Sequence, residues 1–176
     1  MIIGAQIIGL VAFLLFVYSV QVKDKKKLLV LQLIANFLYG LQYVCLLAPT
    51  AGYMNFISVF RCFMFYWYDN KNEKIPLWLL IAICLLIICV GACSFDNILE
   101  LIPIAITLAY TISSWQKDMK VIRITFTLCA LGWIFYNITV GAYTALIGNT
   151  FELISGIVSL IRYRKKESWF FVLFVL

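Results

Sequence analysis

Histidine is absent from this 176-residue chain, and charged residues make up only 12% of it. A soluble domain carries about twice that share of charge and is roughly half apolar, whereas this sequence is 65% hydrophobic. One soluble core cannot bury such an excess, so lipid is the expected solvent. The sequence also lacks Ser-His pairs, a Gly-rich phosphate loop and paired acidic residues inside its apolar runs. An enzyme is therefore the least favoured class, and neither a cofactor nor a metal is expected.

Acidic residues are scarce as well, with eight against 14 basic ones and a formal net charge of +6. The basic residues follow the apolar runs and form no groove with interleaved aromatics. We therefore expect anionic lipid headgroups as partners, and no nucleic acid. Six cysteines lie inside or at the edges of apolar runs without metal-ligand spacing, which favours a packing role.

Seven apolar runs approach the length of about 20 helical residues that a bilayer core of about 30 Å requires. They are Ile2–Val20, Leu28–Leu46, Ala51–Tyr68, Ile75–Cys93, Ile98–Ser114, Val121–Val140 and Ala142–Ile161. Lysine and arginine follow the odd-numbered runs and are missing from the turns after the even-numbered ones. The positive-inside rule then predicts an outside N-terminus and a cytoplasmic C-terminus. The last apolar stretch, Trp169–Leu176, is too short to span and either lies in the interface or begins a longer segment.

A block of three runs occurs twice, displaced by 94 positions. Lys23-Asp24 falls on Lys117-Asp118, and Asn55 falls on Asn149. Parallel repeats in apolar chains are typical of pseudo-symmetric membrane proteins, often transporters. Because three helices per unit is an odd number, a linker helix must cross once more to give both units the same orientation. The predicted fold is all-α, with two parallel triple-helix bundles and a linker (3+1+3): residues 1–68, 69–97 and 98–166, then a tail over 167–176.

This layout resembles the SWEET, PQ-loop and PnuC-type transporters. Leu38-Tyr39-Gly40 is similar to their aromatic-Tyr-Gly segment, although Ser19-Val20-Gln21 lacks the proline of their Pro-Gln signature. Asn55 and Asn149 match in position the paired asparagines that face the sugar in SWEETs, which implies a solute site at the pseudo-symmetry axis.

A closer resemblance is to the YgjV family of bacterial inner-membrane proteins. It rests on four short motifs: Glu100-Leu101-Ile102-Pro103, Phe60-Arg61, Trp133 with Tyr136-Asn137 before Gly141-Ala142, and Ile161-Arg162-Tyr163-Arg164. The resemblance implies this small-transporter fold and an inner-membrane location, and no established biochemical activity.

Polar residues inside the apolar runs are the candidate functional residues, because each charge at membrane depth costs about 2.5–3.5 kcal/mol on insertion scales. Arg61 and Glu152 are candidates for an ion pair, direct or through a ligand, with either a structural or a gating role. The ligand-binding candidates are Asn55, Asn149, Asn36, Tyr39 and Trp133, although interhelical hydrogen bonding explains the asparagines equally well. Gln6 and Glu100, which are repeat equivalents, are secondary candidates.

Two functions follow from these features. The first is a facilitator or transporter for a small polar solute, working by rocking of two pseudo-symmetric bundles. Coupling to protons would require Glu152 or Glu100 to titrate, and Arg61 would oppose this by holding Glu152 ionised, so a passive facilitator is favoured. The alternative is a non-transporting assembly or regulatory protein on the same fold. Assembly into a homo-oligomer is left open.

Overall fold

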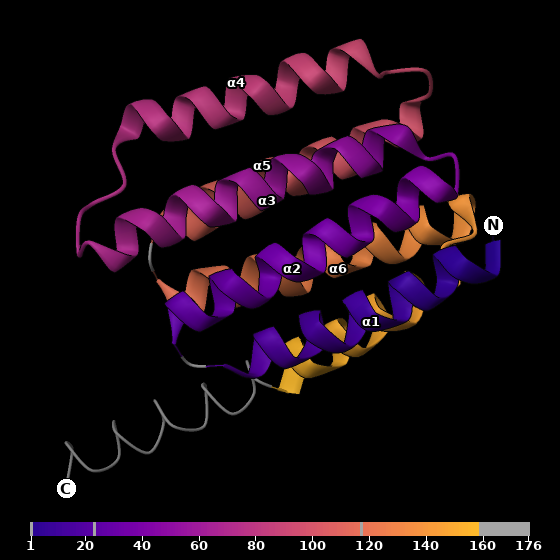
Figure 1. Cartoon of the computed structure of the whole chain (residues 1–176), viewed down its shortest axis with the longest axis horizontal. Helices are drawn as coiled ribbons and strands as arrows, with labels where there is room; N and C mark the ends of the chain where they lie inside the picture. Colours follow the sequence, from indigo (N-terminus) through magenta and orange to yellow (C-terminus); the bar gives the residue numbers. More distant parts are fainter. Residues whose placement is uncertain (1, 23, 117, 159–176) are drawn as a thin grey trace, which may run out of the picture.

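The computed structural model of the chain describes residues 2–22, 24–116 and 118–158 (Figure 1). Helices account for nearly all of these residues and none of them lies in a strand, which confirms the all-α prediction. The predicted tail over 167–176 and the end of the seventh predicted span lie outside the described residues.

The helices follow the predicted runs closely. In chain order they are α1 (Ile2–Gln21), α2 (Lys25–Cys45), α3 (Pro49–Asn70), α4 (Leu77–Cys93), the short 3₁₀ turn η1 (Ile98–Glu100), α5 (Leu101–Trp115) and α6 (Met119–Val140). Residues 143–158 are helical as well and form the last described helix. Prolines account for two of the shifts: Pro49 starts α3 early as an N-terminal proline, and Pro76 holds extended backbone that delays α4.

Repeat-equivalent residues lie at the starts and ends of helices and adopt the same structure in both copies. Asp24 and Asp118 are N-caps whose carboxylates accept hydrogen bonds from the backbone N–H of Lys26 and Lys120, at 2.9 and 2.8 Å. Each hairpin turn contains a left-handed residue shortly after its first helix, with φ of 58° at Leu47 after α2 and 69° at Gly141 after α6. Since both residues sit at one position of the repeat, the 94-residue displacement extends to the backbone conformation.

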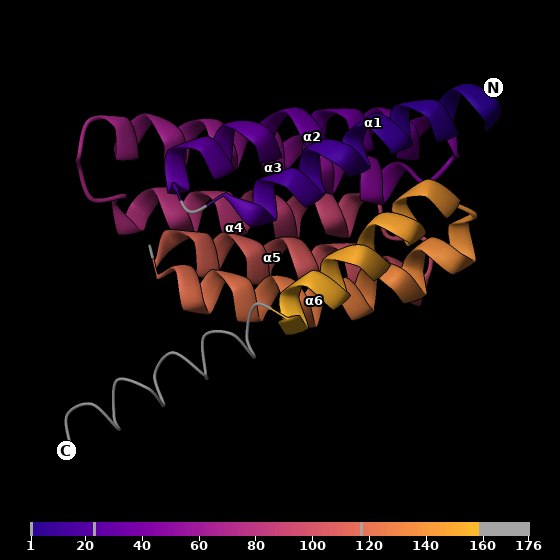
Figure 2. The same ribbon diagram turned by 90° about the horizontal axis from the view of Figure 1, so that it is seen from below.

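Two layers of helices make up the molecule. Figure 2 shows α1, α2 and α3 in one layer and α5, α6 and the 143–158 helix in the other, with α4 beside α3 and α5. Contacts between the layers join α3 to α5, α2 to α6 through Tyr43 and Asn137, and α1 to the 143–158 helix through Phe13 and Phe151.

The helix ends divide the bundle into two chemically different ends. In Figure 1, α1, α3 and α5 end, and α2, α4 and α6 begin, at the end away from the N-terminus. We call this the basic end, because Lys26, Lys71, Lys74 and Lys120 lie there. The opposite, turn end holds the α2–α3 and α4–η1 connections and the turn at Gly141.

Membrane-crossing length and apolarity coincide in three described helical stretches: Lys25–Cys45, Ile98–Trp115 and Lys120–Val140. Two shorter apolar helices, Ile3–Ser19 and Leu77–Cys93, accompany them. The 22 residues of α3 extend about 33 Å, which is long enough to cross a bilayer. This helix is not one of the three stretches, and it contains the charged residues Arg61 and Asp69.

Polarity is distributed inside out relative to a soluble protein. Large apolar side chains such as Leu14, Leu128 and Ile138 are about 60% exposed, whereas Gln32, Arg61 and Glu152 are at most 2% exposed. Exposed apolar side chains all around a bundle suit a lipid exterior, and polar groups then gather where they can pair with each other. The positions of these inward polar side chains define the candidate site.

Candidate functional site

A small cavity of about 30 Å³ lies between the two layers. Every main helix except α4 contributes to it. Its walls are Phe16, Asn36, Tyr39, Tyr43, Asn55, Ser58, Thr107, Tyr110, Trp133 and Asn149. We call it the central cavity. All five side chains predicted as ligand-binding candidates (Asn36, Tyr39, Asn55, Trp133 and Asn149) line it, although they are drawn from four helices.

Repeat-equivalent residues meet at the central cavity. Three pairs of its lining residues, each 94 positions apart, are Phe16 with Tyr110, Tyr39 with Trp133, and Asn55 with Asn149. A fourth equivalent pair, Tyr43 and Asn137, is in direct contact across the layers. Two halves packed face to face about a common axis bring equivalent positions together in this way, so the cavity lies where such an axis would run.

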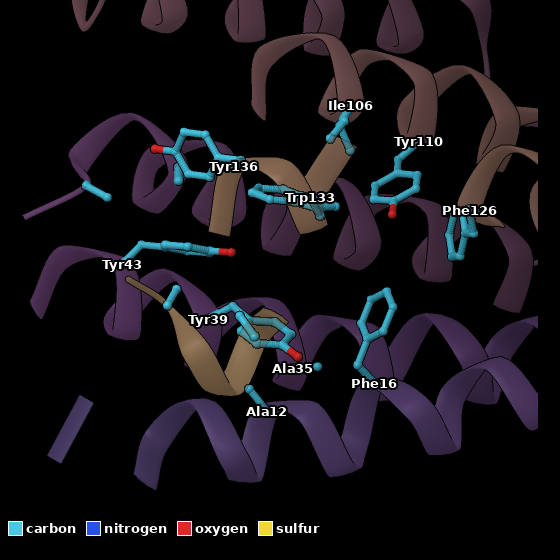
Figure 3. Packing of buried hydrophobic residues seen from close by; sticks show 14 of the residues in the cluster. Ala12, Phe16, Ala35, Tyr39, Tyr43, Ile106, Tyr110, Phe126, Trp133 and Tyr136 are labelled. Carbon is cyan, nitrogen blue, oxygen red and sulfur yellow. The ribbon is translucent and has the colours of Figure 1, made fainter. Parts of the chain in front are cut away.

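Aromatic side chains make up half of the residues that line the cavity. Figure 3 shows them between the layers, with Tyr43 facing Trp133. These two rings are stacked at a centroid distance of 5.7 Å and an interplanar angle of 19°. At the other side Tyr110 packs against Phe126 at 4.4 Å. Rings of this kind supply rigid, largely apolar walls that leave orientation to a few polar groups.

A directed chain of hydrogen bonds runs along one side of the cavity. The Tyr43 hydroxyl donates to Oδ1 of Asn137 at 2.6 Å, and Nδ2 of Asn137 donates to Oδ1 of Asn149 at 2.8 Å. Nδ2 of Asn149 then donates to Oε2 of Glu152 at 3.0 Å. Each donor therefore points toward the carboxyl group. Tyr43 and Asn137 were not among the predicted site residues, and their 94-residue separation was the signal that could have identified them.

Arg61 and Glu152 are both buried. The direct form of the predicted ion pair does not occur among the described residues, and pairing through a ligand stays a prediction. The Arg61 guanidinium donates to Oγ1 of Thr111 at 3.4 Å and contacts the sulfur of Cys62 at 3.8 Å. Glu152 instead accepts from Asn149. The reason is direction: Arg61 is turned toward α5, whereas Glu152 faces α6.

Tyr110 lies near both charges, since each acts electrostatically on its hydroxyl. That hydroxyl has no hydrogen-bond partner among the described residues, although the Trp133 indole approaches it. Nε of Arg61, Oε1 of Glu152 and both amide atoms of Gln32 are also buried without such a partner. Several buried polar atoms without hydrogen-bond partners therefore lie in one region, and such atoms would stabilise a water molecule or a polar solute there.

A second cavity of about 10 Å³ lies nearer the basic end. It is lined by Leu28, Ile122, Arg123, Phe126, Thr127, Glu152 and Gly156. Gly156 allows α6 to come close, because a Cβ atom at this position would overlap the Thr127 side chain. Glu152 thus reaches this cavity directly and the central cavity through Asn149.

Comparison with family models identifies the chain. Residues 3–167 match the model Imp-YgjV, described as a bacterial inner membrane protein. The chain belongs to the Imp-YgjV family. Comparison with curated proteins and with solved structures gave no match. Membership of Imp-YgjV places the apolar exterior in a bacterial inner membrane and agrees with the family resemblance drawn from the sequence.

Gln6 forms a group of hydrogen bonds at the turn end of this Imp-YgjV protein. Its Oε1 accepts from the backbone N–H and the hydroxyl of Thr144 at 3.2 and 2.9 Å, and its Nε2 donates to the Gly141 carbonyl at 3.1 Å. Gln42 joins them by donating to the Thr144 hydroxyl at 2.8 Å. These bonds tie α1 and α2 to the opposite layer and close the turn end.

Glu100, the repeat equivalent of Gln6, has a different role. Its Oε2 accepts from the backbone N–H of Asp96 at 2.9 Å, within the connection that leads into α5. It therefore does not reach the central cavity in this Imp-YgjV protein. The six cysteines are free, and the described residues contain no cluster of three or more potential metal ligands.

Proposed function

We propose that this Imp-YgjV protein is a carrier for a small polar solute, with the central cavity as its solute site. The observation that carries the proposal is the meeting of three repeat-equivalent pairs at one polar, aromatic-walled cavity between the layers. Carriers built from repeats bind their substrates where the repeats meet, near the bilayer midplane.

The repeat supports a 3+1+3, SWEET-like architecture for this carrier. Its two halves share N-caps at Asp24 and Asp118, left-handed turn residues at Leu47 and Gly141, and a direct contact between Tyr43 and Asn137. The intervening α4 contributes nothing to either cavity and packs on α3 and α5, as a linker would.

The size of the cavity indicates a closed state. Ligand sites usually occupy about 300–1,000 Å³, so 30 Å³ is roughly ten times too small. It suffices for about two water molecules. A solute therefore requires the layers to separate, and the contacts that oppose this at the turn end are those of Gln6 and Gln42 with Thr144 and of Tyr43 with Asn137. Rocking of one layer against the other would break them together.

Asn55 and Asn149 would contribute differently to binding. Nδ2 of Asn55 donates to the Ala51 carbonyl of its own helix at 2.8 Å, which leaves Oδ1 as an acceptor without a donor among the described residues. Asn149 uses both its amide atoms in the chain to Glu152. Asn55 is therefore the cleaner position at which to test solute binding.

The test uses the purified full chain and a pool of radiolabelled sugars, vitamins and small acids. Thermal-shift screening selects the members that stabilise the protein, and uptake into proteoliposomes measures their flux. We expect Asn55→Ala to lose the thermal response and at least tenfold of uptake, as about 1.4 kcal/mol of lost binding would produce. Asn70→Ala, an exposed asparagine at the end of α3, is the matched control and should behave as wild type.

Two outcomes would contradict the proposal. One is the absence of flux for every member of the pool; reproducible co-purification of a partner protein would then favour a non-transporting assembly or regulatory role. The other is equal uptake by wild type and Asn55→Ala, which would remove the central cavity from the solute path.

A further inference from the structure

Glu152 connects the two cavities. Its side chain is 2% exposed and lines the second cavity toward the basic end. Its Oε2 accepts a hydrogen bond from Asn149, whose side chain lines the central cavity. The carboxyl group therefore contacts the second cavity directly and the central cavity through the Asn149 amide, and each cavity has the volume for at least about one water molecule.

Among the described residues, the hydrogen bond that Glu152 accepts does not come from a positively charged group. Its hydrogen bond comes from a neutral amide, and its Oε1 has no partner among the described residues. The titratable groups that its charge affects are Tyr39 on α2, Tyr110 on α5 and Cys129 on α6. All three are neutral at physiological pH in their usual state, so none of them compensates a carboxylate.

Arg123 and Arg61 lie in this region, and the hydrogen bond that the described structure gives Glu152 comes from Asn149 rather than from either arginine. Arg123 of α6 lines the second cavity, where it has interactions of its own. Arg61 of α3 donates a hydrogen bond to Thr111 on α5, and both Arg61 and Glu152 act electrostatically on Tyr110. An ionised carboxylate in such a site is costly, and taking up a proton removes the cost.

The position of Glu152 also provides a route for the proton. The second cavity reaches Leu28 and Ile122, in the first turns of α2 and α6 at the basic end. On the other side, the Asn149 amide separates the carboxyl group from the central cavity, which has the volume for about two water molecules. Separation of the layers would admit water there and give the carboxyl group access toward the turn end.

We propose that Glu152 is a proton-binding site that takes up a proton from one side of the membrane and releases it to the other as the layers rock, which makes the carrier proton-coupled. The inference rests on the proposed function. The proton adds to a carboxylate oxygen, only an O–H bond forms or breaks, and no redox partner is needed. The sequence favoured a passive facilitator because Arg61 was expected to hold Glu152 ionised, and the direct pair that would do so is missing here.

The first test detects the proton itself. Infrared difference spectroscopy of the full chain in lipid should show the carbonyl stretch of a protonated carboxyl group at neutral pH, and this band should disappear reversibly in alkaline buffer. The band should be missing in Glu152→Gln and retained in Glu73→Gln, a matched change at an exposed position. No band at neutral pH, or a band that survives all alkaline conditions, would overturn the inference.

The second cavity can be tested by the same band. Thr127→Val removes a hydroxyl from its wall, and since that hydroxyl donates to the Arg123 carbonyl of its own helix, the fold should be kept. We expect the carboxyl band to remain and its exchange in deuterated buffer to slow severalfold. An unchanged exchange rate would exclude the second cavity as the proton's path.

Coupling is tested with the radiolabelled pool in proteoliposomes under an imposed pH gradient. Wild type and Glu73→Gln should accumulate solute, whereas Glu152→Gln should lose accumulation but keep exchange of labelled for unlabelled solute. Uptake that is indifferent to the gradient, or accumulation by Glu152→Gln, refutes coupling and leaves the carrier function intact. Absence of uptake in all variants refutes the carrier function, while the infrared band still reports whether Glu152 binds a proton.

Discussion

The contact between Tyr43 and Asn137 should carry a measurable part of the adhesion between the layers. Tyr43→Phe removes only the hydroxyl and leaves Oδ1 of Asn137 without its donor, at sites 3% and 0% exposed. Interhelical hydrogen bonds in membrane bundles contribute about 0.6 kcal/mol on average and about 1.7 at most. A 2.6 Å bond between buried groups belongs near the upper limit, so we expect a loss of about 1.5 kcal/mol.

Thermal unfolding of the purified protein measures this loss. A chain of this length shifts its Tm by about 2–4 °C per kcal/mol, so Tyr43→Phe should unfold about 3–6 °C below wild type. Tyr18→Phe makes the same chemical change on the lipid-facing side of α1, where the ring is 63% exposed, and should leave the Tm unchanged. A double-mutant cycle with Asn137→Ala should return a coupling energy of about 1 kcal/mol or more.

The reasoning is refuted if Tyr43→Phe and Tyr18→Phe unfold within about 1 °C of each other. A cavity water that replaces the hydroxyl would recover part of the loss, since water-mediated bonds are nearly as favourable. Such replacement would reduce the coupling energy in the cycle as well, so the two measurements must agree.

Three further predictions follow from the turns and the basic end. Leu47→Gly should stabilise the protein by about 0.5–1 kcal/mol, because a left-handed non-glycine residue costs about 1–2 kcal/mol and the conformational entropy that glycine loses on folding offsets part of that gain. Gly141→Leu, at the equivalent turn position of the second copy, should destabilise it by about 1–2 kcal/mol. Thermal unfolding measures both changes. A fluorescent protein that matures only in the cytoplasm should be bright when fused to the C-terminus and dark at the N-terminus, whereas the reverse would invert the proposed orientation. Lys26 and Lys27 line a groove of about 480 Å³ with Tyr18 and Tyr66, which suits an anionic headgroup. Phosphatidylglycerol should stabilise the protein more than phosphatidylcholine does, and the double change Lys26→Gln with Lys27→Gln should reduce this difference by about 1 kcal/mol per lysine. If Lys74→Gln changes the lipid-dependent thermal shift by as much as the double change does, the groove is not a headgroup site.

Helix positions could be predicted from the sequence because their signals are local. Apolar runs give the extent of each helix, and residues such as Asp24 and Pro49 act on the backbone within a turn. The repeat also carried the prediction of which side chains meet, since Asn55 and Asn149 line one cavity as their equivalence suggests. Residues at equivalent positions of the repeat are expected at the same depth in the bundle and at the same distance from the pseudo-symmetry axis, so the repeat alone can predict that they meet.

The pairing of Arg61 with Glu152 could not be predicted in the same way, because it depends on rotation about the helix axis. Their depths in the bundle are similar, but the neighbour that each side chain faces is decided by packing. Glu152 is directed to α6, where Gly156 lets Thr127 approach, and Arg61 is directed to Thr111 on α5. The polar partners in the layer interface, including Asn137, follow from tertiary contacts that no local pattern records.

Direct contact between Tyr43 and Asn137 has a consequence for how such a chain differs from a dimer of identical subunits. On the twofold axis of a homodimer, a side chain meets its own copy, so the contact must be self-complementary. Fusing the two units into one chain removes that constraint and allows a hydroxyl donor to face an amide acceptor. The hydrogen bonds from Tyr43 to Glu152 can then all point one way, giving the interior a polarity that a symmetric pair of subunits would be unable to hold.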